Sequence, residues 1–217
     1  MTSRATRWRL KSIQAFDRMK LRRLRDRHPG VILDPEASTN FASSHYELGA
    51  GAQLEIGPRV YTERRSRGVY FSIGEGARVE IGADTWLRSD LAPVLIFAFP
   101  GARIRIGREG FLNGCHLSAK RSVDIGDRVW IGMGSRLLDA DQHDLDADRP
   151  ERVAPIRVGD HCWIAADVTV LRGVSIGEQS VIGTRSTVTR SLSPHTLALG
   201  SPAVAAGAIG DRTGLSI

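Results

Sequence analysis

The stretch that decides the fold is residues 156–190, which read IRVGDHCWIAADVTVLRGVSIGEQSVIGTRSTVTR. An aliphatic side chain recurs at every sixth position: Val158, Ile164, Val170, Ile176, Ile182 and Val188. The residue two positions before each of these is apolar or small: Ile156, Cys162, Val168, Val174, Ser180 and Ser186. A short β-strand places such alternate residues on one face, whereas an amphipathic helix needs apolar spacings of three and four. The pattern therefore predicts one short strand per hexapeptide.

The same kind of block recurs along the chain at longer intervals. An aliphatic-x-aliphatic-Gly block ends at glycines that are 25, 25, 19, 33 and 18 residues apart: Gly57, Gly82, Gly107, Gly126, Gly159 and Gly177. Three hexapeptides make 18 residues, so we predict a triangular coil with one hexapeptide on each side. The predicted fold class is all-β, a parallel β-helix over about residues 46–192, between an N-terminal segment 1–45 and a C-terminal extension 193–217. The glycines are expected to permit a corner conformation that a side chain would resist.

Composition limits the other classes of protein. The chain has 217 residues, of which 41% are hydrophobic and 25% charged, and this excludes a mainly disordered chain. No apolar run approaches the ~18 residues of a membrane-spanning helix, and no secretory signal is expected. Cys115 and Cys162 are too few for a disulfide framework. We expect free thiols and a cytoplasmic protein.

The positive charge is concentrated in the first thirty residues. The net charge of the whole chain is +6, but residues 1–30 carry ten Arg and Lys against Asp17 and Asp26, so the remainder is slightly acidic. Apolar residues recur there at a spacing of three, at Leu10, Ile13, Phe16 and Met19, and Pro29-Gly30 ends the pattern. The segment is predicted to be a basic amphipathic helix that either lies on an anionic membrane surface or packs on the protein itself. Nucleic-acid binding is disfavoured because the acidic remainder offers no basic groove.

The C-terminal half resembles a known family. The run from Trp163 to Arg190, followed by Gly200-Ser201-Pro202-Ala203, resembles the hexapeptide-repeat acyltransferases, and most closely the maltose, galactoside and capsule-type O-acetyltransferases. The resemblance is dense over residues 105–205. It implies a left-handed parallel β-helix, a homotrimer with active sites between neighbouring subunits, and acetyl-CoA as the acyl donor.

The long insertion at residues 138–157 is the expected catalytic loop, because a long loop in a tight repeat is more often functional than idle. His143 is the only His in it, close in sequence to Asp139, Asp141 and Asp144. A His with a pKa near neutral suits removal of the acceptor hydroxyl proton, although a solvent-exposed His in an acidic loop fits the residues equally well. The resemblance implies that His143 is the general base.

The resemblance assigns further site residues. It implies that Asn113 holds the acceptor, although Asn-Gly is also a strong turn signal. It implies that backbone amides near Ala165 and Ala166 bind the thioester carbonyl, with Ala165 standing where Gly is usual. It places four residues along the CoA groove: Thr184, Thr189, Arg190 and Pro202. A solvated edge of the prism is nearly as good an interpretation of Thr184.

Three other features favour structural roles. Cys162 occupies an inward position of the repeat, so packing is favoured over nucleophilic catalysis. Trp130 and Trp163 are expected to stack on one outer face, where a subunit contact is favoured. His116, His143 and His161 lack the closely spaced pair of a three-His metal site, and we expect no metal.

We therefore predict an acetyl-CoA-dependent O-acetyltransferase that acts on a sugar or saccharide hydroxyl by direct transfer. An acceptor linked to a lipid would explain a basic helix that holds the enzyme at the inner face of a membrane. An amino-sugar N-acetyltransferase and a non-catalytic β-helix scaffold remain the alternatives.

Overall fold

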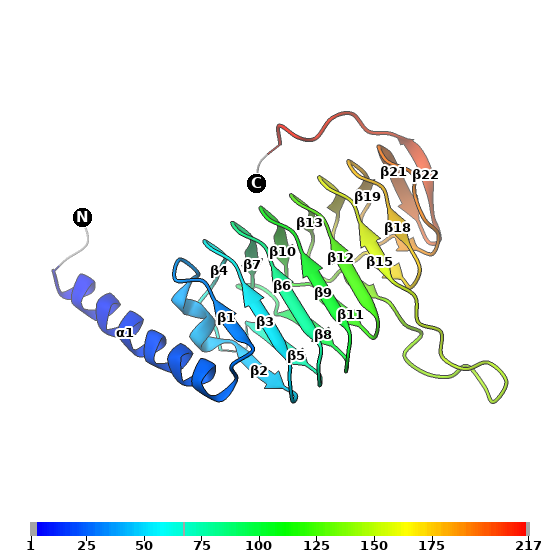
Figure 1. Ribbon diagram of the computed structural model, residues 1–217. Helices are drawn as coiled ribbons and strands as arrows, with labels where there is room; N and C mark the ends of the chain where they lie inside the picture. Colours follow the sequence, from blue (N-terminus) through cyan, green and yellow to red (C-terminus); the bar gives the residue numbers. More distant parts are fainter. Residues whose placement is uncertain (1–3, 67, 216–217) are drawn as a thin grey trace.

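The structure, a computed structural model, describes residues 4–66 and 68–215 (Figure 1). A helix, α1 (Arg4–Arg27), precedes a regular coil of short strands that winds repeatedly through three parallel sheets. Residues 1–3 of the predicted N-terminal segment and residues 216–217 of the predicted C-terminal extension lie outside the described residues. No helix in the described ranges is long and apolar enough to cross a membrane.

Each coil passes through sheets I, II and III in that order. Sheet I contains β1 (Val31–Leu33), β3 (Gln53–Ile56), β6 (Arg78–Ile81), β9 (Arg103–Ile106), β12 (Ser122–Ile125), β15 (Ile156–Val158) and β18 (Ser175–Ile176). Sheet II contains β4 (Tyr61–Thr62), β7 (Trp86–Arg88), β10 (Phe111–Asn113), β13 (Trp130–Ile131), β16 (Trp163–Ile164), β19 (Val181–Ile182), β21 (Thr196–Gly200) and β22 (Ala203–Ala208). Sheet III contains β2 (His45–Leu48), β5 (Val69–Ile73), β8 (Val94–Ala98), β11 (His116–Ala119), β14 (Arg136–Leu138), β17 (Thr169–Leu171) and β20 (Thr187–Val188).

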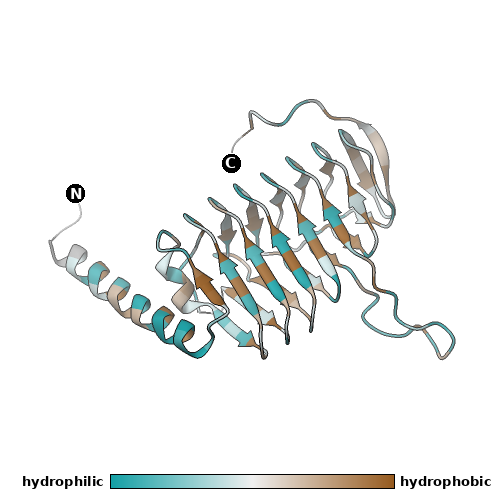
Figure 2. Ribbon diagram, viewed as in Figure 1, coloured by the Kyte–Doolittle hydropathy of each residue, from teal (hydrophilic) through white to brown (hydrophobic). Residues whose placement is uncertain are grey.

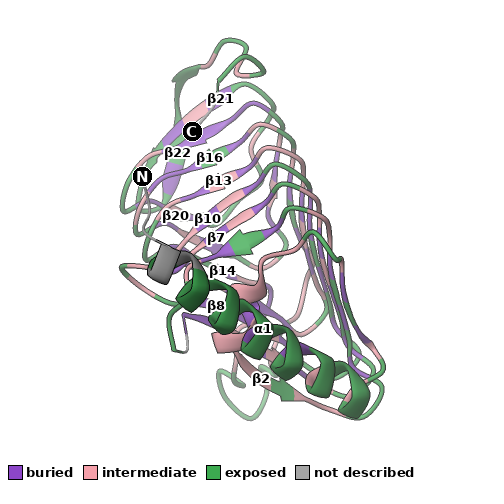
Figure 3. Ribbon diagram, turned by 90° about the vertical axis from the view of Figure 1, so that its left-hand side faces the viewer, coloured by how far each residue is buried: buried purple, intermediate pink, exposed green. Residues whose placement is uncertain are grey.

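The strands stack in register, so each inward side chain lies on its equivalent in the next coil. In sheet I, Leu54 pairs with Val79, Val79 with Ile104, and Ile104 with Val123, and all are buried. Apolar and polar residues alternate along the strands, and the buried positions line the inside of the prism (Figures 2 and 3). This column of small aliphatics is the hydrophobic core that stabilises the fold.

The pairing extends beyond the predicted limits of residues 46–192 at both ends. β1 already pairs with β3, and β2 begins at His45. At the other end β21 pairs in parallel with β19, and β22 then turns back against β21 as the one antiparallel partner among the described strands. Both ends of the β-helix therefore include residues that the hexapeptide pattern does not mark.

The repeated glycines have a different role from the predicted one. None of the six block glycines has a positive φ, and the left-handed conformation falls two residues later, as at Glu109 (φ 55) after Gly107. A Cβ on Gly107 would meet the backbone oxygen of Gly126 in the next coil at 2.4 Å. The predicted reason for these glycines, a corner conformation that only Gly adopts easily, was therefore wrong. Glycine is required because successive coils stack too closely to leave room for a side chain.

The predicted N-terminal helix is present, and its C-terminal half is anchored to the first coil. Leu21 is buried, and Asp17, which is 1% exposed, accepts two hydrogen bonds of 2.9 Å from the Arg64 guanidinium. The N-terminal half of the helix extends away from the β-helix (Figures 1 and 3). Trp8, in this half, is 74% exposed. A short 3-10 helix, η1 (Thr39–Ser43), packs beside α1.

Candidate functional site

Several of the predicted site residues lie in one column along the corner between sheets II and III, the II/III corner. Asn113 ends β10, Ala165 and Ala166 follow β16, and Thr184 follows β19. Backbone hydrogen bonds join the turns of successive coils, from Gly134 N–H to Gly114 O at 3.0 Å and from Arg185 N–H to Ala166 O at 3.0 Å. Pro202 is exposed in the turn that follows β21, on the same side of sheet II. The repeat thus stacks these residues on one another.

The other predicted site residues lie on the opposite edge of sheet III, the III/I corner. The loop of residues 139–155 leaves sheet III after β14 and carries His143 away from the body (Figure 1). Thr189 and Arg190 follow β20 at the same edge, and both are exposed. Strand β11, which spans sheet III between the two corners, has four residues and is therefore ~13 Å long. A single chain does not bring His143 and Asn113 together.

The three carboxylates near His143 in sequence fix the loop rather than the imidazole. Asp139 is fully buried and accepts 2.7 Å hydrogen bonds from the backbone N–H groups of Lys120 and Arg121, while burial raises its pKa. Asp141 pairs with Arg172. Asp144 accepts the N–H of Glu151 at 2.7 Å. His143 is exposed and has no hydrogen-bond partner among the described residues.

Lys120 joins the loop to the body. Its ammonium lies 2.7 and 2.8 Å from the two carboxylate oxygens of Glu151 and donates to the carbonyl of Gln142 at 3.4 Å. It also lies 5.1 Å from the centroid of the Phe99 ring. Lys120 therefore contacts both arms of the loop, including the residue before His143. The sequence pattern did not single out Lys120, because its partners lie in a distant segment.

Two buried polar atoms near the II/III corner have no hydrogen-bond partner among the described residues. They are Oδ1 of Asn113 and Nε2 of His116, in strands β10 and β11. Burial, and secondarily the nearby Arg136, lowers the pKa of His116, so its ring is neutral at pH 7. Because buried polar atoms in folded proteins are normally hydrogen-bonded, both atoms are unsatisfied polar groups at this corner. The sequence pattern gives no signal for a role of His116 beyond the disfavoured metal site.

The two predicted oxyanion amides differ in their hydrogen bonding. Ala165 N–H donates to Ile182 O at 2.9 Å and is therefore occupied by the β-helix itself. Ala166 N–H has no acceptor among the described residues. Ala166, and not Ala165, is the residue whose amide can bind a ligand oxygen.

The cysteines and tryptophans have structural surroundings. Burial raises the pKa of both Cys115 and Cys162 to about 12, so neither thiol is a nucleophile at neutral pH. Trp130 and Trp163 pair in register on the outer face of sheet II, as predicted, and the guanidinium of Arg212 lies 5.2 and 5.8 Å from their ring centroids. A segment of the C-terminal extension thus contacts both rings, and Trp163 remains 42% exposed. The described residues contain no group of three side chains that could hold a metal ion.

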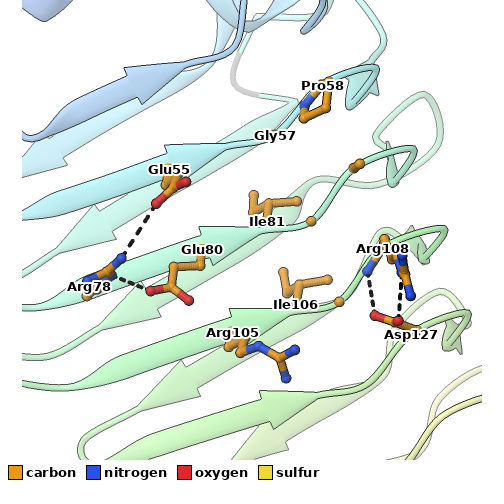
Figure 4. Close-up of a pocket in the computed structure, with 13 residues that line it drawn as sticks. Glu55, Gly57, Pro58, Arg78, Glu80, Ile81, Arg105, Ile106, Arg108 and Asp127 are labelled. Atoms are coloured by element: carbon orange, nitrogen blue, oxygen red, sulfur yellow. Dashed lines mark hydrogen bonds and ion pairs between the residues drawn. The ribbon is translucent and has the colours of Figure 1, made fainter.

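A pocket on the outer face of sheet I is separate from both corners (Figure 4). Its charged lining is largely paired: Arg108 lies 2.9 Å from Asp127, and Arg78 pairs with Glu55 and Glu80. None of the predicted site residues lines this pocket. We interpret it as a ladder of ion pairs between coils.

Comparison with known proteins shows which family part of the chain is similar to. Residues 155–190 match a family model described as bacterial transferase hexapeptide (six repeats). Together with the three parallel sheets, this confirms the predicted resemblance to the hexapeptide-repeat acyltransferases and the fold class, a left-handed parallel β-helix with an N-terminal helical extension.

The chain is similar to several curated proteins over part of its length. It is 44% identical over 85 residues to a candidate acetyltransferase of Schizosaccharomyces pombe, covering 37% of this chain and 41% of the relative. It is 48% identical over 82 residues to WcaF of Escherichia coli (strain K12), a candidate colanic acid biosynthesis acetyltransferase, covering 38% of this chain and 45% of the relative. The matches thus span less than half the length of these relatives.

Two solved structures share the fold. The polySia specific acetyltransferase NeuO superposes with a TM-score of 0.58 at 21% identity, covering 86% of this chain and 91% of NeuO. AntD, an N-acyltransferase from Bacillus cereus in complex with dTDP and 3-hydroxybutyryl-CoA, gives a TM-score of 0.53 at 16% identity, covering 77% and 85% of the two chains.

Proposed function

We propose that the protein is an acetyl-CoA-dependent O-acetyltransferase that acts on a saccharide hydroxyl. The observation that carries the proposal is the arrangement of the two corners. One edge of sheet III carries a His on a clamped loop, and the other edge carries Asn113 and, two coils further on, the Ala166 amide, each with an atom that has no hydrogen-bond partner among the described residues. Relatives named as acetyltransferases, one of them in colanic acid biosynthesis, support the same activity.

The reaction is a direct transfer. His143 takes the proton of the acceptor hydroxyl while that oxygen attacks the thioester carbonyl carbon. The Ala166 N–H donates to the carbonyl oxygen as negative charge develops on it. The carbon–sulfur bond then breaks, and the proton passes from His143 to the sulfur of CoA, so no bond to the protein forms. Asn113 Oδ1 orients the acceptor by accepting one of its hydroxyl protons.

The proposed assembly is a homotrimer in which the His143 loop of one subunit meets the II/III corner of its neighbour. The separation of the two edges in one chain supports this arrangement. The CoA groove would then use residues from both edges, with Thr184 and Pro202 on one subunit and Thr189 and Arg190 on the next. Arg190 would place a cation near a CoA phosphate. Light scattering should give the mass of three chains, and the mass of one chain at micromolar concentration would exclude a shared site.

A screen of acceptors tests the activity. Purified protein is incubated with acetyl-CoA and sugars, amino sugars or lipid-linked saccharides, and the acetylated product is located by mass spectrometry and NMR. Acetylation at a hydroxyl supports the proposal. Acetylation only at an amine would favour the amino-sugar alternative, for which AntD provides an N-acyltransferase of similar fold. No transfer to any acceptor would favour a scaffold.

The proposed location of the protein is the cytoplasmic face of a membrane, with the N-terminal half of α1 lying on anionic lipid. This half exposes apolar side chains, including Trp8, Ile13 and Phe16, among several Arg and Lys. Cations near an anionic leaflet contribute about 1 kcal/mol each. We expect sedimentation with phosphatidylglycerol vesicles that weakens as salt rises and is lost when residues 1–30 are deleted. Equal sedimentation with phosphatidylcholine vesicles, or none with either, would favour a helix packed on the trimer.

A further inference from the structure

Aromatic rings form a continuous row on the outer face of sheet III, on the coils that precede Asn113. His45 stacks on Tyr70 with ring centroids 4.3 Å apart, Tyr70 meets Phe97 edge-on at 5.5 Å, and Phe97 meets His116 edge-on at 4.9 Å. We call these four residues the sheet III aromatic row. All four side chains are half-buried, so each ring is partly exposed to solvent. The row crosses four coils, and three steps at the usual interstrand spacing give ~14 Å.

One end of the row reaches the candidate site. His116 carries one of the two unpartnered buried atoms, and it is only three residues from Asn113, which carries the other. The exposed Arg136 lies next to His116 in the following coil, where the two residues pair in register. The aromatic row therefore leads directly to the place where the acceptor hydroxyl would be held.

The other end of the row opens into a basic groove between α1 and β2. The groove is lined by Lys20, Arg23 and Arg27 of the helix, together with His45 of the aromatic row. Among the described residues, no carboxylate forms an ion pair with any of these three helix cations. This differs from the body of the β-helix, where cations such as Arg59 and Arg108 have carboxylate partners within 3 Å. The groove thus has positive charge that no carboxylate in residues 4–66 and 68–215 neutralises through an ion pair.

The acidic residue beside the row is already engaged. Glu47 accepts a hydrogen bond from the hydroxyl of Tyr70 and lies 3.3 Å from Nε2 of His45. These hydrogen bonds lower the pKa of Glu47, with that from Tyr70 having the largest effect. The carboxylate therefore fixes the orientation of two rings and leaves the three cations of the groove to an outside anion.

From this continuity we infer that the acceptor is an acidic oligosaccharide or polysaccharide that lies along the sheet III aromatic row, with its carboxylates in the groove of Lys20, Arg23 and Arg27. The apolar C–H face of a sugar ring packs on aromatic rings, and guanidinium groups pair with carboxylates through two parallel hydrogen bonds. A row of rings with cations at both ends accommodates a chain of uronic or sialic acid residues better than a neutral mono- or disaccharide. This inference names the substrate class and rests on the proposed function.

The test measures binding without any acyl donor. Full-length protein is titrated by calorimetry with oligogalacturonate, hyaluronan fragments and sialic acid oligomers, and with the carboxyl-reduced form of each. We expect at least one acidic oligosaccharide to bind, to weaken as salt rises, and to lose its binding on carboxyl reduction. Failure of every acidic oligosaccharide to bind better than its reduced form would overturn the inference.

Two pairs of variants locate the binding. Replacing Lys20, Arg23 and Arg27 together by Ser should weaken the acidic ligand about tenfold or more. The matched control replaces Arg18, Arg22 and Arg25 by Ser, because these line a second groove on the other side of α1. Tyr70→Ala should weaken binding about fivefold. Its matched control is Tyr61→Ala, on the outer face of sheet II.

The outcomes separate the two proposals. Equal losses from the test and control variants would overturn the inference and indicate nonspecific attraction to the basic helix. Efficient acetylation of neutral sugars without any binding of acidic ones would overturn the inference and leave the proposed function standing. Binding along the row with no acetyl transfer to any bound ligand would leave the inference standing as a binding surface and count against the proposed function.

Discussion

The two edges of sheet III differ in how their residues are held. At the II/III corner each coil from β10 onward makes a short turn, and backbone hydrogen bonds between turns stack Asn113, Ala166 and Thr184 in a column. At the III/I corner one coil leaves through residues 139–155, and side-chain ion pairs from Lys120 and Arg172 hold that loop. The repeat therefore positions one half of the candidate site, and the insertion positions the other half.

The largest effect on kcat is expected from a change in the loop at the III/I corner. His143→Ala should lower kcat by about 10²–10⁴, the usual contribution of general acid–base catalysis, because no other described His lies on the loop. Since His143 is exposed and has no partner in the described ranges, the circular dichroism and the oligomeric mass should not change. Asp148→Ala on the same loop is the control and should keep full activity. An unchanged kcat in His143→Ala, measured with the true acceptor, would remove this residue from the mechanism.

A smaller effect, on kcat/KM, is expected from a change at the II/III corner. Asn113→Ala removes one hydrogen bond to the acceptor, which corresponds to a loss of about 5- to 100-fold in kcat/KM. The thermal midpoint should hardly move, because Oδ1 of Asn113 has no hydrogen-bond partner in the part of the chain that the structure describes. A large loss of stability with normal kcat/KM would show instead that Asn113 serves only the turn before Gly114.

Mixing the two variants tests whether the edges meet between subunits. Trimers assembled from equal amounts of His143→Ala and Asn113→Ala chains contain some interfaces at which both edges are intact. Random assembly gives roughly a quarter of such interfaces. Co-refolded mixtures should therefore recover roughly a quarter of the wild-type rate, while either variant refolded alone should not. No recovery in trimers shown by mass to be mixed would place both residues in one subunit's own site.

The difference between the edges also explains what the sequence could predict. The hexapeptide period predicted the inward residues, the alignment of Trp130 with Trp163 on neighbouring strands and the position of the long loop, because each follows from counting residues within a regular coil. It did not predict that Ala165 N–H is occupied while Ala166 N–H is free, since that depends on the backbone geometry of a turn. Nor did it predict the contact between Lys120 and Glu151, because partners 31 residues apart across an irregular loop obey no period. The predicted role of the glycines was wrong for a similar reason. The hexapeptide period shows where small residues recur, but it does not show which neighbouring atoms exclude a side chain at those positions.

The smallest effect on kcat is expected from a change of Lys120, which connects the loop to the β-helix. Lys120→Met keeps the aliphatic stem over the ring of Phe99 but removes the ammonium that contacts Glu151 and the carbonyl of Gln142. The loop retains its contacts through Asp139 and Asp141, so the fold should persist and unfolding should become easier by no more than about 1 kcal/mol. Because a base displaced by even about 1 Å reacts more slowly, kcat should fall about tenfold while KM for acetyl-CoA stays the same. Arg149→Met is the matched control, since Arg149 pairs with Asp146 near the tip of the loop and does not contact the body. Equal rates in the two variants would show that the loop is positioned by its carboxylates or by the neighbouring subunit, and not by Lys120.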